Sequence, residues 1–124
     1  WQIIGKDPII ICDTGHNKDA LQIIFNQIKA ISYKKLHIVF GLVNDKDTNA
    51  ILDILPKNAK YYFCKPNIRR GLDENSLQLL ASKKEINGKS HISVKKALLA
   101  AKKAAESRDL IFVGGSTFVV AEVV

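Results

Sequence analysis

The chain has 124 residues, of which 47% are hydrophobic and 25% are charged. This length and composition suit one folded domain with a hydrophobic core and exclude an intrinsically disordered chain. The longest apolar runs, residues 9–12 and 118–121, are far shorter than the roughly 20 residues that span a bilayer, so we expect no membrane association. Cys12 and Cys64 stand in separate apolar runs. This placement argues against a disulfide framework or a zinc site and favours a reducing cytoplasm.

The formal net charge of +7 raises the question of nucleic-acid binding. Four lysines, at 95, 96, 102 and 103, share one face of a predicted helix, opposite its apolar residues. Aromatic residues are not interleaved with them, as a single-strand binding surface would require. We therefore predict a solvated helix face and no nucleic-acid partner. A free-standing nucleotide- or RNA-binding module is the alternative that the charge supports.

The first half of the chain alternates predicted strands and helices. A Gly-Lys-Asp-Pro turn separates apolar runs at residues 1–4 and 9–13, which predicts an opening hairpin. Apolar residues with the helical period predict a helix over 17–31, capped by Asn17. The nearly continuous apolar run 36–41 is typical of a central strand buried on both faces. A short helix over 48–55, which Pro56 ends, and a strand over 60–64 follow.

The second half continues this alternation. A loop over 65–71 leads to a predicted helix over 73–83, followed by an irregular segment at Asn87 and Gly88. Ser93 can cap a helix that we expect to end near Ser107, and residues 109–113 form the last predicted strand before a closing helix. The order predicts one α/β domain over residues 1–124. We expect a three-layer, Rossmann-like, mainly parallel sheet, with helices on both faces and an antiparallel N-terminal edge hairpin.

Three predicted strand ends carry unusual polar residues, in the segments 13–17, 41–47 and 114–116. The carboxyl ends of parallel strands meet at one edge of a sheet, where ligands of open α/β sheets bind. Asp13 can accept hydrogen bonds from ribose hydroxyls or help to hold a metal, and it can equally stabilise a turn. His16 can donate a hydrogen bond to a carboxylate or a phosphate, with a purely structural role as the alternative.

The two other segments have a similar ambiguity. Gly114 and Gly115 allow backbone N–H groups to approach a ligand, and Ser116 can contact an anion or simply cap the closing helix. The segment 41–48 lacks the second glycine of a phosphate-binding loop. Some polar residues of these loops and strands are explained without a functional role, as surface groups or as structural histidines. They are Asp45, Lys46, Asp47, Arg69, Arg70, His37 and His91.

With these segments in place, the chain resembles the C-terminal domain of the folylpolyglutamate synthase family, whose bacterial members in many cases are also dihydrofolate synthases. The resemblance covers essentially all 124 residues. The family commonly has Asp-Gly-Ala-His-Asn-Pro where this chain has Asp-Thr-Gly-His-Asn at 13–17, followed by Lys18. Further matches are Phe40-Gly41, Asp45-Lys46-Asp47, Arg69 or Arg70, and Gly115-Ser116.

The resemblance implies an ATP-dependent amide ligase. In this family a carboxylate of dihydropteroate or a reduced folate is activated as an acyl phosphate, and the amine of glutamate attacks it. The resemblance assigns Asp13 and Asn17 to ATP, and His16 and Ser116 to glutamate. It leaves the charged loop residues 45–47, 69 and 70 as further contacts, and it assigns no catalytic or metal-binding residue to this chain.

The resemblance also implies a partner domain. The phosphate-binding loop and the Mg²⁺ ligands of the family belong to a larger N-terminal domain, so we expect a chain that is inactive alone. The absence of methionine and the start at Trp1 lead us to expect a piece cut from a longer cytoplasmic enzyme, which is monomeric. A muramyl-peptide ligase of the same superfamily is the nearest alternative, and Asp45-Lys46-Asp47 and Gly115-Ser116 argue against it.

Overall fold

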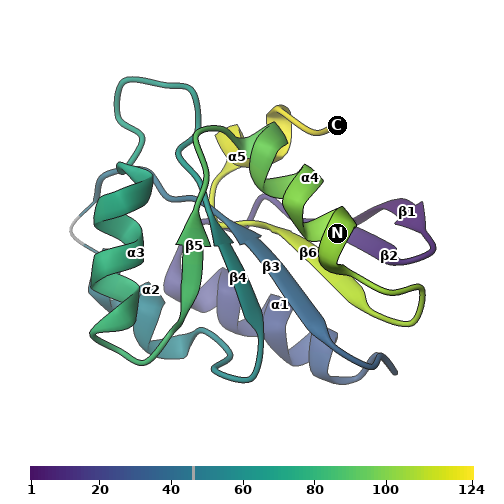
Figure 1. Ribbon diagram of the computed structural model, residues 1–124. Helices are drawn as coiled ribbons and strands as arrows, with labels where there is room; N and C mark the ends of the chain where they lie inside the picture. Colours follow the sequence, from purple (N-terminus) through teal and green to yellow (C-terminus); the bar gives the residue numbers. More distant parts are fainter. Residues whose placement is uncertain (46) are drawn as a thin grey trace.

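The computed structural model describes residues 1–45 and 47–124. Its six strands form one sheet in the order β1-β2-β6-β3-β4-β5 (Figure 1). The strands are β1 (Gln2–Lys6), β2 (Ile9–Cys12), β3 (Leu36–Phe40), β4 (Lys60–Phe63), β5 (Gly88–Ser90) and β6 (Leu110–Gly114). Only β1 is antiparallel to its neighbour, and the other pairs are parallel. The predicted fold class is confirmed, including the antiparallel hairpin at one edge.

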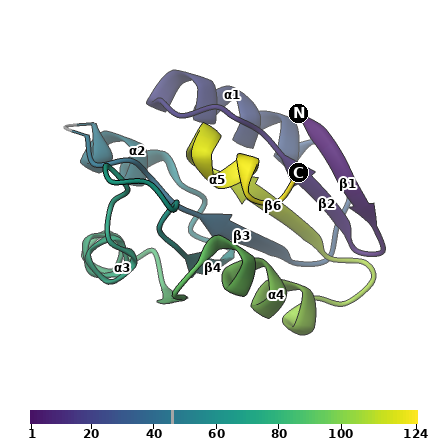
Figure 2. The ribbon, with the colours of Figure 1, turned by 90° about the horizontal axis from the view of Figure 1, so that it is seen from above.

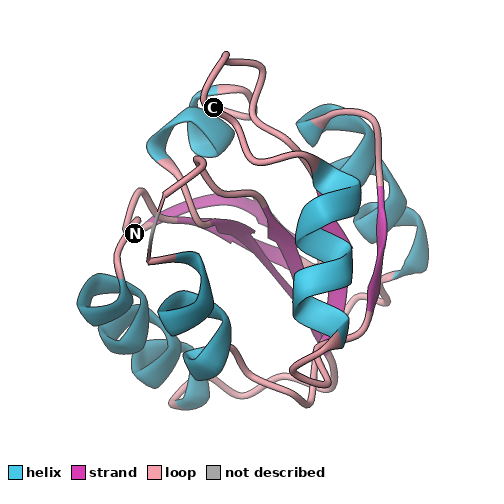
Figure 3. Cartoon of the chain, turned by 90° about the vertical axis from the view of Figure 1, so that its left-hand side faces the viewer, coloured by secondary structure: helices cyan, strands magenta, loops and turns pink. Residues whose placement is uncertain are grey.

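Five helices lie on the two sides of this sheet (Figure 3). They are α1 (Lys18–Lys29), α2 (Thr48–Ile54), α3 (Glu74–Ser82), α4 (Val94–Ala104) and α5 (Thr117–Ala121). Within the described residues no helix has the length and apolar character needed to cross a membrane. The four lysines of α4 predicted to lie in solvent are all exposed.

Alternate side chains of the buried strands pack into two separate hydrophobic cores, one on each side of the sheet. Ile38, Phe40 and Phe112 belong to the core beneath α1, α2 and α3. Val39 and Val113 belong to the core beneath α4 and α5. Strands β3 and β6 are buried along their whole length, which explains why their sequences are nearly continuous apolar runs.

Polar side chains begin four of the five helices by accepting hydrogen bonds from free backbone N–H groups. Asn17 accepts from Ala20 N at the start of α1, and Ser93 accepts from Lys96 N at the start of α4. Both predicted caps are confirmed. Asp73 and Ser116 fulfil the same role for α3 and α5.

Two predictions about the second half of the chain are wrong. Of the segment predicted to be irregular, Asn87 lies outside the regular elements, but Gly88 begins β5, an edge strand of low strand propensity. A Cβ at residue 88 would collide with the Tyr61 carbonyl oxygen, so glycine is what lets the two backbones approach. Helix α4 ends at Ala104 rather than near Ser107, because the chain turns back and Glu106 N donates to Asp109 Oδ2 over 3.0 Å.

Candidate functional site

The three polar strand ends lie side by side, because β2, β6 and β3 are neighbours in the sheet. Asp13 N donates to Val113 O over 3.2 Å, and Gly41 N donates to Gly114 O over 3.3 Å. These bonds extend the pairing just past the strands and tie the three segments together. Figure 2 looks down on this edge from above, with α1 on one side of the sheet and α4 on the other. The prediction that these segments meet at one edge is confirmed, and we call this edge the carboxyl edge.

The Asp13 carboxylate is divided between two contacts. Its Oδ1 accepts a hydrogen bond of 2.9 Å from Gly15 N, which closes the turn between β2 and α1. Its Oδ2 lies 2.7 Å from the amino nitrogen of Trp1 at the start of the chain, and 18% of the side chain is exposed. One oxygen therefore stabilises the corner, as one of the two interpretations of Asp13 predicts.

His16 and Asn17 follow Asp13 at the start of α1, and both are exposed. The His16 ring has a hydrogen-bond contact within its own corner, in which Nδ1 lies 3.3 Å from the carbonyl oxygen of Thr14. Asn17 Oδ1 is occupied, because it accepts from Ala20 N over 2.8 Å. A ligand at this corner would therefore meet the His16 ring and the amide nitrogen of Asn17, which is a donor.

The turn from β6 into α5 is tightly packed against the end of β3. Gly115 has φ of +100°, a conformation that L side chains rarely adopt, and a Cβ there would collide with the Gly41 carbonyl oxygen. Ser116 is 1% exposed, and its Oγ accepts from Phe118 N over 3.1 Å. The capping interpretation of Ser116 is confirmed, and the hydroxyl keeps its own proton for a second partner.

Two charged loops lie against each other beside these corners. Val43 and Gly71 form an isolated antiparallel bridge, and Asn44 N donates to the Arg70 carbonyl oxygen over 2.6 Å. The side chains of Asp45, Asp47, Arg69 and Arg70 are exposed. The structure therefore brings the predicted loop contacts together at the rim of the carboxyl edge, except for Lys46, which lies outside the described residues.

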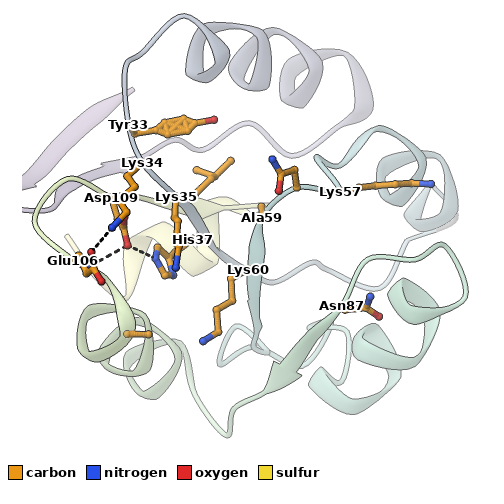
Figure 4. Close-up of a pocket in the computed structure, with 13 residues that line it drawn as sticks. Tyr33, Lys34, Lys35, His37, Lys57, Ala59, Lys60, Asn87, Glu106 and Asp109 are labelled. Atoms are coloured by element: carbon orange, nitrogen blue, oxygen red, sulfur yellow. Dashed lines mark hydrogen bonds and ion pairs between the residues drawn. The ribbon is translucent and has the colours of Figure 1, made fainter.

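A buried polar cluster lies at the opposite, amino edge of the sheet (Figure 4). His37 Nε2 is 2.9 Å from Asp109 Oδ2, and His37 Nδ1 is 2.8 Å from the Tyr62 hydroxyl oxygen. Burial opposes ionisation of Asp109, but hydrogen bonds from Glu106 N and His37 outweigh it and hold the Asp109 pKa below its usual value. The sequence predicted His37 to be structural but gave no sign of its partners, which lie in β4 and just before β6.

The two cysteine thiols are buried, and their pKa values are raised. Cys12 and Cys64 are both unpaired and buried, as predicted. Burial raises the pKa of Cys12 to about 11 and that of Cys64 to about 12. In the described part of the chain, no three histidine, cysteine or acidic side chains gather as they would around a metal ion.

Comparison with known proteins identifies the family. The model of the family described as "Mur ligase, glutamate ligase domain" matches residues 1–117. The chain belongs to this family. A relative from Haloferax volcanii, named as a probable bifunctional folylpolyglutamate synthase/dihydropteroate synthase, is 32% identical over 98% of the chain. The alignment covers 15% of that relative.

Solved structures lead to the same family. The glutamate ligase domain superposes on Escherichia coli FolC in complex with ADP with a TM-score of 0.89 at 31% identity. It also superposes on a bifunctional folylpolyglutamate synthase/dihydrofolate synthase with Mn, AMPPNP and L-glutamate bound, with a TM-score of 0.84 at 25% identity. Each alignment covers 98% of this chain and 29% of the other. The resemblance inferred from the sequence is therefore confirmed, and the chain spans less than a third of these proteins.

Proposed function

We propose that this chain is the C-terminal domain of an ATP-dependent ligase that joins glutamate to dihydropteroate or to a reduced folate. The observation that carries the proposal is the meeting of three polar corners, from β2, β3 and β6, at one edge of the sheet. A similar protein has been solved with AMPPNP and L-glutamate bound, which supports a site for both molecules. The amide forms when the amine of glutamate attacks an acyl phosphate of the acceptor and expels phosphate.

We assign Asp13 and Asn17 to the binding of ATP. Asp13 Oδ1 is bonded to Gly15 N, so Oδ2 is the oxygen that would accept from ribose hydroxyls, in place of its contact with the Trp1 nitrogen. Asn17 would offer its amide nitrogen, because its oxygen caps α1. In the complete enzyme, ATP supplies the phosphoryl group that activates the acceptor carboxylate, and Mg²⁺ neutralises the charge of its phosphates. Both are held mainly by the N-terminal domain.

We assign His16 and Ser116 to the binding of glutamate. His16 is exposed at the start of α1, whereas the Ser116 hydroxyl is buried at the start of α5, where it accepts from Phe118 N and still carries a proton. Both groups can donate to a carboxylate oxygen, which is how a glutamate α-carboxylate would be positioned. Their contribution is orientation of the amine toward the acyl phosphate rather than proton transfer.

The charged loops form the rim of this site. Arg69 and Arg70 carry fixed positive charge, and the backbone of Arg70 is bonded to the loop that carries Asp45 and Asp47. We assign the arginines and the segment 45–47, Lys46 included, to contacts with substrate or with the N-terminal domain. Closure of the two domains would exclude water from the acyl phosphate. The complete enzyme acts as a cytoplasmic monomer.

The test is phosphate release from ATP by the complete enzyme, supplied with glutamate and either dihydropteroate or tetrahydrofolate. We expect release that depends on both the acceptor and glutamate. The variant His16→Ala should raise the KM for glutamate about tenfold while leaving the KM for ATP near its original value, because one charge-assisted hydrogen bond is worth roughly 1.5 kcal/mol. The variant Lys95→Gln, on the exposed face of α4, is the matched surface control.

Muramyl-nucleotide acceptors serve as the contrasting substrates. Release with these acceptors alone would keep the fold and overturn the folate assignment. An unchanged glutamate KM in His16→Ala would remove His16 from the glutamate side.

A further inference from the structure

One part of the sheet surface is left open beside α4. This helix packs on β3, β4 and β6, whereas β5 lies beyond it at the edge of the sheet. A groove of about 550 Å³ follows this edge, a volume within the usual range for small-molecule sites. We call it the β5 groove. It is lined chiefly by Lys60, Tyr62, Lys89, His91, Ala100 and Ala104.

Two aromatic rings line the β5 groove. The rings of Tyr62 and His91 are 5.9 Å apart between centroids and inclined by 33°. The Tyr62 hydroxyl is bonded to His37, which is bonded in turn to Asp109. Because this buried cluster fixes the Tyr62 ring, a flat ligand would meet a surface that needs no rearrangement. The small side chains of Ala100 and Ala104 leave room for such a ligand against α4.

The His91 ring has a buried polar atom that is left without a partner. Within the described residues His91 Nε2 has no hydrogen bond, although the atom is shielded from solvent. Buried polar groups of this kind nearly always have partners, so a ligand group or a water molecule at this nitrogen would complete its hydrogen bonding. Burial and the charge of Lys89 lower the His91 pKa, which favours the neutral imidazole, and this form can donate one hydrogen bond.

The charge around the β5 groove has one sign. Lys60 and Lys89 flank it, and Lys60 Nζ lies 5.8 Å from the centre of the Tyr62 ring. Among the described residues that line the groove there is no carboxylate. In Figure 4 the Lys60 side chain extends from the start of β4, on the side toward α4. An occupant with negative charge is therefore complementary to this groove, and a cation is not.

We propose that the β5 groove binds a small, flat aromatic molecule that carries an anionic group such as a carboxylate. Its ring would pack against Tyr62 and His91, and its anionic group would lie between Lys60 and Lys89 and accept from His91 Nε2. The groove lies on another part of the sheet from the carboxyl edge. The proposal is therefore independent of the ligase function and stands or falls on its own.

The test uses the 124-residue chain and 2-naphthoate as the probe, followed by ¹H–¹⁵N NMR and by the His91 ring signals. We expect saturable shifts confined to β4, β5, α4 and the His91 ring. Two comparison probes test the contributions of the aromatic rings and of the charge separately. Naphthalene-2-carboxamide keeps the rings without the charge, and cyclohexanecarboxylate keeps the charge without an aromatic face. Each should bind at least about fivefold more weakly, since an aromatic contact and a screened ion pair are each worth about 1 kcal/mol.

Variants then locate the site. Lys60→Gln removes an exposed charge and should weaken 2-naphthoate binding about threefold, as expected for a surface ion pair. Lys95→Gln removes an exposed lysine of α4 outside the groove and should leave the affinity unchanged. Ala100→Leu fills the groove from α4 and should abolish the shifts. Lys60→Gln changes only an exposed side chain, so it keeps the test valid if Ala100→Leu unfolds the chain.

Any of three results would overturn the proposal. The first is the absence of saturable shifts at millimolar 2-naphthoate, or shifts that map to Asp13, His16 and Ser116 instead. The second is equal binding of the naphthoate and its uncharged amide, which would remove the anionic group from the recognition. Shifts that depend on protein concentration alone would assign the groove to self-association and would also overturn it.

Discussion

The polar side chains at the two edges of the sheet differ in their burial and in their hydrogen-bond partners. At the amino edge, Asp109, His37 and Tyr62 are buried and bond to one another across three adjacent strands. At the carboxyl edge, the polar groups bond to the backbone of their own corners, and His16 is left exposed. The three side chains of the first arrangement are buried, whereas the second leaves the His16 ring exposed to a partner.

This difference separates stability from ligand binding. Losing any one member of this buried cluster is costly, because the remaining groups stay buried without partners, as Asp109 Oδ1 already does among the described residues. A corner held by backbone bonds keeps its shape when an exposed side chain is removed. We therefore expect changes at the amino edge to reduce the free energy of unfolding, and changes at the carboxyl edge to reduce ligand affinity more than stability.

Removal of Asp109 should give the largest effect. The variant Asp109→Ala leaves His37 Nε2 and Glu106 N without their acceptor, and we expect the free energy of unfolding to fall by about 3 kcal/mol. Urea unfolding measures this free energy. Asp73→Ala is the matched control, because it removes an exposed aspartate that only caps α3 and should cost about 1 kcal/mol. Equal losses in the two variants would show that the buried cluster adds no special stability.

A methyl group at Gly115 should give the next largest effect. Gly115→Ala places a Cβ against the Gly41 carbonyl oxygen at a φ of +100°, so we expect a loss of about 2 kcal/mol. Gly15→Ala is the control at the neighbouring corner. There the new Cβ would meet Cδ1 at the flexible end of Ile24, which can move aside. A smaller loss for Gly115→Ala than for Gly15→Ala would contradict the tight packing between β3 and β6.

Much of the fold could be predicted from local signals. The helical period of α1, the Asn17 and Ser93 caps, and the buried runs of β3 and β6 are properties of adjacent residues. Strand β5 could not be predicted, because Gly-Lys-Ser has no strand preference and its pairing with β4 needs the close approach of Gly88 to Tyr61. The end of α4 depends on Asp109, which lies beyond the helix and captures Glu106 N.

The candidate site divides in the same way. The meeting of the three corners follows from a parallel sheet, so their shared edge could be predicted before the strand order was known. The amino-edge cluster could not, since His37, Tyr62 and Asp109 are far apart in sequence and become neighbours only through strand pairing. The β5 groove depends on β5, which could not be predicted, and on α4, which leaves the groove uncovered. No sequence pattern therefore predicts this groove.

A change that affects stability and binding together should have a moderate effect. Ser116→Ala removes the α5 cap, so we expect a loss of about 1 kcal/mol in the free energy of unfolding and a higher glutamate KM in the complete enzyme. Ser93→Ala removes the same kind of cap from α4, away from the carboxyl edge, and should cost similar stability without a change in KM. A KM that rises equally in both variants would assign the effect to lost stability alone.

Removal of the His16 ring should have the smallest effect on stability. Within the described residues its one hydrogen-bond contact is with Thr14 O at 3.3 Å, so His16→Ala should change the free energy of unfolding by less than about 0.5 kcal/mol. The same variant is expected to change the glutamate KM most, so its two readouts should lie at opposite extremes. A loss of more than about 1 kcal/mol in urea unfolding would mean that His16 holds the corner together, and the contrast between the two edges would fail at the residue that best represents it.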